Sequence, residues 1–401
     1  MLYVPVTYSE RDFMAAIAEI EIIHVQLPTR REHKWTGLTE PIGGYVLVRL
    51  GSDNGVSGWG EAPALKDWGG DYGHYFGESP GTTKHVVERY LGPAVTGCAV
   101  GNFAELHQRM DAVIKGYPYA KAAIDLAAYD LAGRTLGVPV YNLLGGKVRD
   151  AVPVTHSIGL LDIGVAVDEC KQVVAEGIRT IKIKVGVDAK RDVEIIGRAR
   201  EAVGPDIDLC VDANQGYETV RDAIRTIRAM ERFGLKYAEQ PVEGVDRMAE
   251  VTRAIETPVM ADETAWTAHD VLEIAERRAA DIVSIYTTKP GGLYRAMEVA
   301  AVARAAKLLC NVNGSVETGV GNLANVHLAA AAESVTLSCV VPVSMPAEAQ
   351  SGNIAGIYYS DDLIASPFDF RDGAVMVPDG PGMGIDVDTA KIEKYRNTQL
   401  D

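Results

Sequence analysis

The sequence is poor in cysteine, and its cysteines form no recognisable pattern. There are five, scattered and odd in number, with no Cys-x-x-Cys pair. This pattern indicates reduced, buried thiols in a cytoplasmic protein. No apolar run approaches the roughly 20 residues of a membrane span. The first residues also lack the basic-then-apolar order of a secretory signal, so we expect a cytoplasmic protein that does not contact a membrane.

Positive charge is also scarce. The chain has 39 Lys and Arg residues against 55 Asp and Glu residues, which gives a formal net charge of −16. A chain this acidic binds nucleic acids and anionic membranes poorly. No GxGxxG or Walker-type glycine pattern follows a predicted strand, and this weakens a nucleotide-binding interpretation.

The 401 residues are too many for one typical core, and the pattern of the sequence changes along the chain. Residues 1–145 read as an α+β unit. Within it, "AEIEIIHVQLP" alternates as a strand does, and "GGYVLVRLGSDNGVSGWGE" reads as strand, Asn-Gly turn and strand. Helical periodicity follows and is clearest in "AKAAIDLAAYDLAGRTLG", where Gly137 is expected to end the helix.

Residues 146–365 contain short apolar strands that alternate with helical stretches, which is typical of a parallel sheet. Seven strands within roughly 160 residues favour a closed (β/α) barrel over an open sheet. The segment 366–401 returns to hairpin-like sequence, and we expect it to pack on the first unit. The predicted strands are "VPVTHS", "TIKIKV", "IDLCVDAN", "KYAEQP", "TPVMADE", "DIVSIYTT" and "LLCNVN".

Three successive barrel strands each end in a carboxylate that should face inward: Asp212, Glu239 and Asp262. Functional sites of such barrels lie at the C-terminal strand ends. Three converging carboxylates would repel one another unless a cation neutralises them. All-oxygen ligation with open positions suits Mg²⁺. Solvated loop charges or simple ion pairs with lysine are the structural alternative.

The neighbouring strand "TIKIKV" directs two lysines, Lys182 and Lys184, to the same inner side. We predict that Lys184, nearer the strand end, removes the proton α to a substrate carboxylate. Lys182 would hold that carboxylate and favour the neutral form of Lys184. Bound Mg²⁺ would stabilise the resulting enediolate, so the expected partner is a small carboxylate.

These residues, with several further motifs, resemble the enolase superfamily, in its mandelate racemase/muconate lactonizing enzyme group. The resemblance covers nearly the whole chain. It implies a modified (β/α)₇β TIM barrel, with an α+β capping domain built from the N-terminus and the C-terminal tail. It also implies one catalytic Mg²⁺ and a homo-oligomer, either a dimer or an octamer. In that family the counterparts of Asp212, Glu239 and Asp262 bind the metal, and that of Lys184 is the base. The motifs are "GWGEA", "AAIDLAAYDLAGRTLGVPVYNLLGGKVRDAVPV", "KIK", "DAN", "EQP", "ADE", "PGGL" and "DGPGMGI".

One position departs from the family pattern. The subgroup usually has a lysine five residues before the Gly-Gly pair, and here that residue is Tyr286, with Lys289 three residues further on. The loss argues against two-base racemization and is compatible with dehydration of a hydroxy acid, in which Lys184 also protonates the departing hydroxyl. Tyr286 could instead act on the other face in a racemase or epimerase, and cycloisomerization is a third possibility. A non-catalytic binding protein of the same fold and a Schiff-base aldolase are rival interpretations.

In this family two loops of the first domain close over the barrel mouth and set specificity. Here they are "TRREHKWTGLTEPI" and "ALKDWGGDYGHYFGESPG", both rich in polar side chains. They predict a polar, hydroxylated substrate, or a cationic amine next to a Trp. The residues predicted to contact substrate are Asn214, Glu317, Trp35, Trp68, His74 and His156.

Overall fold

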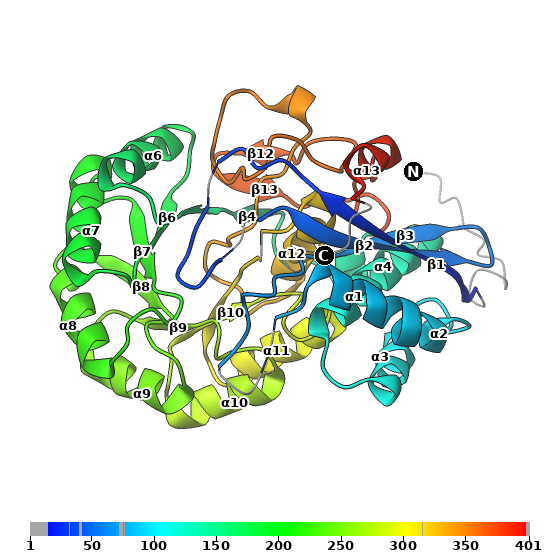
Figure 1. Ribbon diagram of the computed structural model, residues 1–401, viewed down its shortest axis with the longest axis horizontal. Coiled ribbons are helices and arrows are strands. Elements are labelled where there is room, and N and C mark those ends of the chain that lie inside the picture. Colours follow the sequence, from blue (N-terminus) through cyan, green and yellow to red (C-terminus); the bar gives the residue numbers. More distant parts are fainter. Residues whose placement is uncertain are drawn as a thin grey trace, which may run out of the picture.

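Two units lie side by side in the computed structural model, which describes residues 15–31, 33–39, 42–71, 75, 77–314 and 316–397. Figure 1 shows one unit as a curved parallel sheet with helices along its outer side, and the other as three long strands beside a group of helices. No helix within these ranges has both the length and the apolar surface required to span a lipid bilayer.

The first unit is an antiparallel sheet of three strands in the order β1-β2-β3, covered by helices. The predicted Asn-Gly turn joins β2 to β3, and Gly55 has a φ of +84° there. Helix α4 ends at Gly137, as predicted, with a φ of 69°. The strands are β1 (Ile17–Gln26), β2 (Gly44–Ser52) and β3 (Ser57–Ala62), and the helical segments are α1 (Pro80–Val86), η2 (Val87–Leu91), α2 (Gly92–Val95), α3 (Phe103–Val113), α4 (Pro118–Leu136) and α5 (Val140–Leu143).

Helix α4 packs directly on strand β3 because the strand has glycines on that side. A Cβ atom at Gly58 or Gly60 would collide with the backbone of α4, at Leu131 or Ala123 respectively. The "GWGEA" motif is therefore a packing requirement for this close approach. It also fixes the position of Glu61, the next residue of the strand.

The second unit has a seven-stranded parallel sheet in the order β11-β10-β9-β8-β7-β6-β5, which confirms the predicted alternation of strands and helices. Helices α6 to α10 form its outer arc in Figure 1. The strands are β5 (Thr155–Ile158), β6 (Thr180–Lys184), β7 (Asp208–Asp212), β8 (Leu235–Glu239), β9 (Val259–Ala261), β10 (Ile282–Ile285) and β11 (Leu309–Val312). The helices are α6 (Ile163–Ala175), α7 (Ala189–Val203), α8 (Val220–Glu231), α9 (Val245–Ala254), α10 (Ala268–Arg277), α11 (Leu293–Ala305) and α12 (Gly319–Ala331).

The segment 335–340 lies between the two edge strands of this sheet. Val335 forms a parallel bridge with Cys310 of β11, and Cys339 forms one with Val154, just before β5. The backbone N–H of Thr155 also donates to the carbonyl of Cys339, at 2.8 Å. These contacts are isolated bridges and do not form a strand. The seven parallel strands are established, whereas closure of the sheet into a (β/α)₇β barrel remains a prediction.

The C-terminal part of the chain returns to the start of the second unit and to the first. Strands β12 (Phe370–Arg371) and β13 (Ala374–Met376) pair with β4 (Ala151–Pro153) as a small antiparallel sheet. Beyond the short 3₁₀ turn η3 (Ala347–Ala349) and these strands, α13 (Thr389–Tyr395) leads to a bridge between Arg396 and Val25 of β1. The domain bounds at residues 145 and 365 remain predictions.

Glu61 joins the two units at the N-terminus of α12. Its carboxylate is fully buried and accepts hydrogen bonds from the backbone N–H of Thr318 (2.9 Å) and of Gly321 (3.2 Å), as well as from the Thr318 hydroxyl. Burial raises the pKa of Glu61 to about 8, against the opposing effect of the Thr318 hydrogen bonds. The folded protein therefore holds a proton on this carboxyl more tightly than the unfolded chain does.

Replacing Glu61 with glutamine is expected to flatten part of the pH dependence of stability. The ordinary pKa of 4.5 is raised to about 8 on folding. The tighter binding of this proton by the folded protein adds to the free energy of unfolding. The contribution is fully present below pH 4.5 and is lost as the pH rises through about 8. Melting temperatures measured from about pH 5 to about pH 9 should fall for the wild type relative to Glu61→Gln. A difference between the two proteins that stays constant over this range would contradict the prediction.

Candidate active site

The predicted acidic and basic residues come together at the C-terminal ends of the central strands. In the sheet register, Lys184 of β6 lies beside Asp212 of β7, and Asp212 lies beside Glu239 of β8. Asp262 follows directly after β9. All three carboxylates are at most 1% exposed. Because side chains alternate along β6, Lys182 lies on the same side of the strand as Lys184, two residues further from its C-terminal end.

The two lysines of β6 are ion-paired with these carboxylates. The Lys182 ammonium lies 3.0 Å from both Asp212 and Glu239. The Lys184 ammonium donates to Asp212 Oδ2 at 2.6 Å and to Asn214 Oδ1 at 2.7 Å. Burial alone would lower the pKa of Lys182, but the charges of Asp212 and Glu239 outweigh burial and raise it. Burial alone would raise the pKa of Asp212, but the two ammonium groups lower it to about 2.

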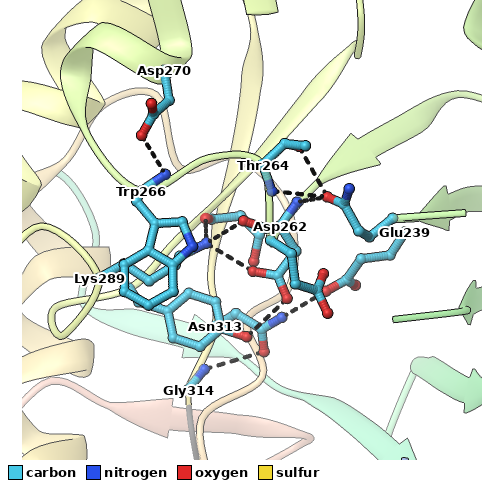
Figure 2. Close-up of polar contacts among 12 residues, drawn as sticks. Glu239, Asp262, Thr264, Trp266, Asp270, Lys289, Asn313 and Gly314 are labelled. Carbon is cyan, nitrogen blue, oxygen red and sulfur yellow. Dashed lines mark hydrogen bonds and ion pairs between the residues drawn. The ribbon is translucent and has the colours of Figure 1, made fainter. Parts of the chain in front are cut away.

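Lys289 and Tyr286 hold the third carboxylate from the other side. Figure 2 shows the Lys289 ammonium pointing at Asp262, where it donates to Oδ1 at 2.7 Å and to the backbone oxygen at 2.9 Å. Its third bond goes to the carbonyl of Ser284, at 2.8 Å. All three hydrogens of the ammonium group are thereby used. The Tyr286 hydroxyl donates to Asp262 Oδ2 at 3.1 Å, and burial raises the Tyr286 pKa, which keeps the hydroxyl neutral.

The turns after β8 and β9 are held in place by Gln240. Its side-chain oxygen accepts hydrogen bonds from the backbone N–H of Asp262 (2.8 Å) and from the Thr264 hydroxyl (3.0 Å). Gln240 and Asn214 both have positive φ, of 36° and 42°. Such backbone strain in residues other than glycine is concentrated at functional sites. The contacts of the Gln240 amide therefore fix where the neighbouring carboxylates lie.

The three carboxylates are the candidate ligands of a magnesium ion. In their present side-chain positions, no three His, Cys, Asp or Glu residues in the described part of the chain are grouped closely enough to hold a metal ion. Burial, followed by the charge of Asp212, raises the pKa of Glu239 to about 8. Three buried carboxylates from consecutive strands are the oxygen donors that Mg²⁺ prefers, so the residues present fit this ion by their chemistry.

A small pocket with a cavity volume of about 40 Å³ lies above these strand ends. Lys182, Lys184, Asn214, Asn313 and Ser157 form its polar floor. The side-chain amide of Asn313 donates to Glu239 Oε1 at 3.0 Å, as Figure 2 shows. The pocket therefore places two ammonium groups and two amides where a carboxylate could bind.

Only some of the predicted substrate-contact residues line the pocket. Asn214, Trp35 and Trp68 line the pocket. His74 lies outside the described residues. Glu317 is buried behind Gly314 and does not reach the pocket surface.

His156 does not line the pocket, so the prediction that it contacts substrate is not supported. It is fully buried, and its Nε2 lies 2.7 Å from the Glu169 carboxylate. Its Nδ1 accepts a hydrogen bond from the backbone N–H of Gly356, at 2.9 Å. Strand alternation directs His156 to the opposite side of β5 from Ser157, which does line the pocket.

Sequence reasoning missed two residues: Glu263, which contacts the pocket residue Asn214, and Tyr358, which lines the pocket. Glu263 accepts a hydrogen bond from the Asn214 amide at 2.9 Å, and burial and the charge of Asp262 raise its pKa. It follows Asp262 in the sequence and would face away in a strand, but β9 ends at Ala261 and the alternation stops there. Tyr358 reaches the pocket from the irregular stretch after η3, where the sequence carries no motif.

Comparison with known proteins identifies the family. Residues 17–145 match the family model of the mandelate racemase/muconate lactonizing enzyme N-terminal domain, and residues 165–391 match that of the enolase C-terminal domain-like family. The chain therefore belongs to the mandelate racemase/muconate lactonizing enzyme family of the enolase superfamily, as its motifs predicted. It is an enzyme of that superfamily.

Individual relatives cover nearly the full length. Muconate cycloisomerase 1 of Rhodococcus opacus is 30% identical over 390 residues, which are 95% of this chain and 98% of the relative. The N-succinyl-L-Arg/Lys racemase of Bacillus cereus is 32% identical over 351 residues, covering 87% and 89%. The muconate lactonizing enzyme of Pseudomonas fluorescens, solved with muconolactone, has a TM-score of 0.87 at 28% identity, covering 96% of this chain and all of that one. All three names describe isomerases, so the predicted dehydratase activity is not confirmed.

Proposed function

We propose that the protein removes the proton α to a substrate carboxylate, with Lys184 as the base and with Mg²⁺ held by Asp212, Glu239 and Asp262. The observation that carries this proposal is the position of Lys184: its ammonium faces the pocket at the level of two of the three carboxylates. When bound, Mg²⁺ supplies positive charge that stabilises the enediolate form of the substrate.

Residues of the chain transfer the proton and keep positive charge at the pocket floor. In its neutral form Lys184 takes the α-proton, and its hydrogen bonds to Asp212 and Asn214 fix the direction of its nitrogen. Lys182 keeps a positive charge close to Glu239 and Asp212 at the floor of the pocket. These residues are at most 9% exposed, and such burial strengthens each of these interactions.

We propose that proton abstraction is followed by β-elimination. The ammonium of Lys184 returns its proton to the departing β-hydroxyl, the Cβ–O bond breaks, and its electrons leave with the oxygen as water. The enediolate electrons form the new Cα–Cβ double bond. One residue on one face is sufficient for both proton transfers. This agrees with the other face, where Tyr286 contacts the pocket and Lys289 uses all its hydrogens elsewhere.

A second candidate function is racemization or epimerization, and the names of the relatives favour it. Tyr286 would then protonate the enediolate on the face opposite Lys184. Its hydroxyl already donates to Asp262, so this role would require it to exchange one acceptor for another. Cycloisomerization of a muconate-like diacid is a third candidate, favoured by the same set of names.

Product analysis distinguishes elimination from isomerization. The protein would be incubated with Mg²⁺ and a set of 2,3-dihydroxy acids. Dehydration gives an enol that becomes a 2-oxo acid, which absorbs after reaction with a hydrazine. Epimerization gives the other diastereomer, which NMR resolves. Accumulation of the epimer without any 2-oxo acid would contradict the elimination proposal.

Substituting lysine for Tyr286 is expected to introduce inversion at the α-carbon. The introduced side chain would place a basic nitrogen on the second face of the pocket, and two bases on opposite faces are what racemization requires. In D₂O the variant Tyr286→Lys should produce the inverted, deuterated isomer, whereas Tyr286→Phe should exchange the α-proton without inversion. Wild-type protein that inverts, and loses inversion in Tyr286→Phe, would instead make Tyr286 the second acid.

A further inference from the structure

Among the described residues that line the pocket, those outside the polar floor are uncharged. We call five of them the distal wall: His33, Trp35, Leu65, Trp68 and Tyr358. The first four come from the two loops of the N-terminal unit and the last from the irregular stretch that follows η3. The ring centroid of Trp35 lies 5.7 Å from the Lys184 ammonium, so the wall begins directly beside the floor. Trp35 and Trp68 are only 8% and 7% exposed, so the large indole rings are fixed by packing.

Four charged residues in the described parts of these loops have partners that hold the loops in place. Arg30 donates to the carbonyl of Asn353 at 2.7 Å, and Arg31 pairs with Glu169 at 2.6 Å. The Lys66 ammonium pairs with Asp67 at 2.9 Å. None of these charged side chains lines the pocket. The polar composition of the loops, which predicted a polar substrate, therefore does not describe the surface that a substrate meets.

His33 does not add a charge to the distal wall. It is buried, and burial, together with the nearby charges of Arg31 and Lys184, lowers its pKa well below the ordinary value. Within the described residues, the ammonium groups of Lys182 and Lys184 are the cations that line the pocket, and both are engaged with carboxylates at its floor.

A stack of aromatic rings stiffens the wall. Trp68 stacks on Tyr286 with a centroid distance of 5.4 Å and an interplanar angle of 27°. On its other side Trp68 stacks on Trp266, at 5.4 Å and 26°. Trp266 in turn stacks on Tyr75, at 4.7 Å and 6°. Flat, pre-positioned rings bind an apolar or aromatic group at low entropic cost.

We propose that the substrate carries a single carboxylate and that its opposite end is an uncharged apolar group, aromatic or branched aliphatic, which packs on the distal wall. This inference rests on the proposed function, because it assumes that the carboxylate binds at the polar floor. A second carboxylate at the far end would have to lose its hydration without meeting a cation, which is costly. A cationic end at the indole face of Trp35 would lie beside the Lys184 ammonium, which is 5.7 Å from the ring centroid, and the two positive charges would repel each other.

Three compounds that differ at the far end test the inference. They are 2-hydroxy-3-phenylpropanoate, 2-hydroxybutanedioate and 4-amino-2-hydroxybutanoate, each measured with Mg²⁺ for α-proton exchange in D₂O and for its shift of the melting temperature. The phenyl compound should exchange at least about tenfold more efficiently and give the largest shift. An equal or greater effect of the diacid or the amine would overturn the inference, and so would the lack of a shift with all three. The same order of shifts without any exchange would support the inference and overturn the proposed function.

Substituting arginine for Leu65 is expected to reverse this preference. Leu65 is partly exposed on the wall, so the longer side chain can be accommodated. The introduced guanidinium would supply the missing cation, and the diacid should gain about 100-fold relative to the phenyl compound, in line with about 1.5–3 kcal/mol for a charge-assisted hydrogen bond. The variant Leu65→Met is the matched control and should keep the wild-type order. If the Leu65→Arg protein melts normally and still prefers the three compounds in the wild-type order, the far end of the substrate does not contact Leu65 and the inference is contradicted.

Discussion

Replacing Lys184 with alanine is expected to lower the rate of α-proton exchange by about 1,000-fold or more, the scale of a lost general base. Lys184 is the lysine of the pocket floor that contacts both Asp212 and Asn214. Rates would be followed by NMR in D₂O with Mg²⁺ and a carboxylate that the wild type exchanges. The variant Lys184→Met removes the same base but keeps most of the side-chain volume, so loss of activity through a cavity can be recognised.

The control for this experiment is Lys190→Ala. Lys190 lies on α7, is exposed, and lines a surface groove rather than the pocket. The variant Lys190→Ala should exchange the substrate α-proton at the wild-type rate. If Lys184→Ala retained more than about a tenth of the wild-type rate while folding normally, Lys184 would not be the base.

Magnesium is expected to raise the melting temperature by several degrees, and EDTA should reverse the rise. A ligand at 100 times its dissociation constant stabilises the folded state by about 2.7 kcal/mol. The physical reason here is charge: the carboxylates of Asp212, Glu239 and Asp262 are buried together, and the Glu239 pKa is raised to about 8. In the variant Asp262→Asn most of the magnesium-dependent shift should be lost, because one anionic ligand is removed.

Asp208→Asn is the matched control for the metal experiment. Asp208 stands at the opposite end of strand β7 from Asp212, is about half exposed, and pairs with Lys236 at 3.4 Å. Its replacement should leave the magnesium-dependent shift unchanged. An equal shift in wild type and Asp262→Asn would mean that the ion binds elsewhere.

The centre of the site could be predicted from the sequence because it follows from strand geometry. The period of two places Lys182 and Lys184 on one side of β6, and parallel pairing places their neighbours in the same row. The register then aligns Lys184, Asp212 and Glu239 without any knowledge of loops. The parallel sheet itself followed from the alternation of short apolar strands with helices.

The walls of the pocket could not be predicted in the same way. Loop sequence shows which side chains are charged but not which partners neutralise them. Arg31, for example, is a loop cation whose partner, Glu169, lies 138 residues further along the chain. Tyr358 comes from an irregular stretch, far from the loops in sequence, with no periodic pattern. Lys289 folds back to Asp262 and Ser284 through a loop, so strand alternation says nothing about it.

The most direct test of the proposed chemistry is the stereochemistry of α-proton exchange by the wild-type protein. The compound 2-hydroxy-3-phenylpropanoate has no β-hydroxyl, so elimination cannot compete with exchange. Incubated in D₂O with Mg²⁺ and analysed by NMR and chiral chromatography, it should gain deuterium at the α-carbon with its configuration retained, and EDTA should stop the reaction. Exchange that continues at the same rate in EDTA, or deuterium that appears only in the inverted isomer, would contradict a magnesium-dependent reaction at a single lysine.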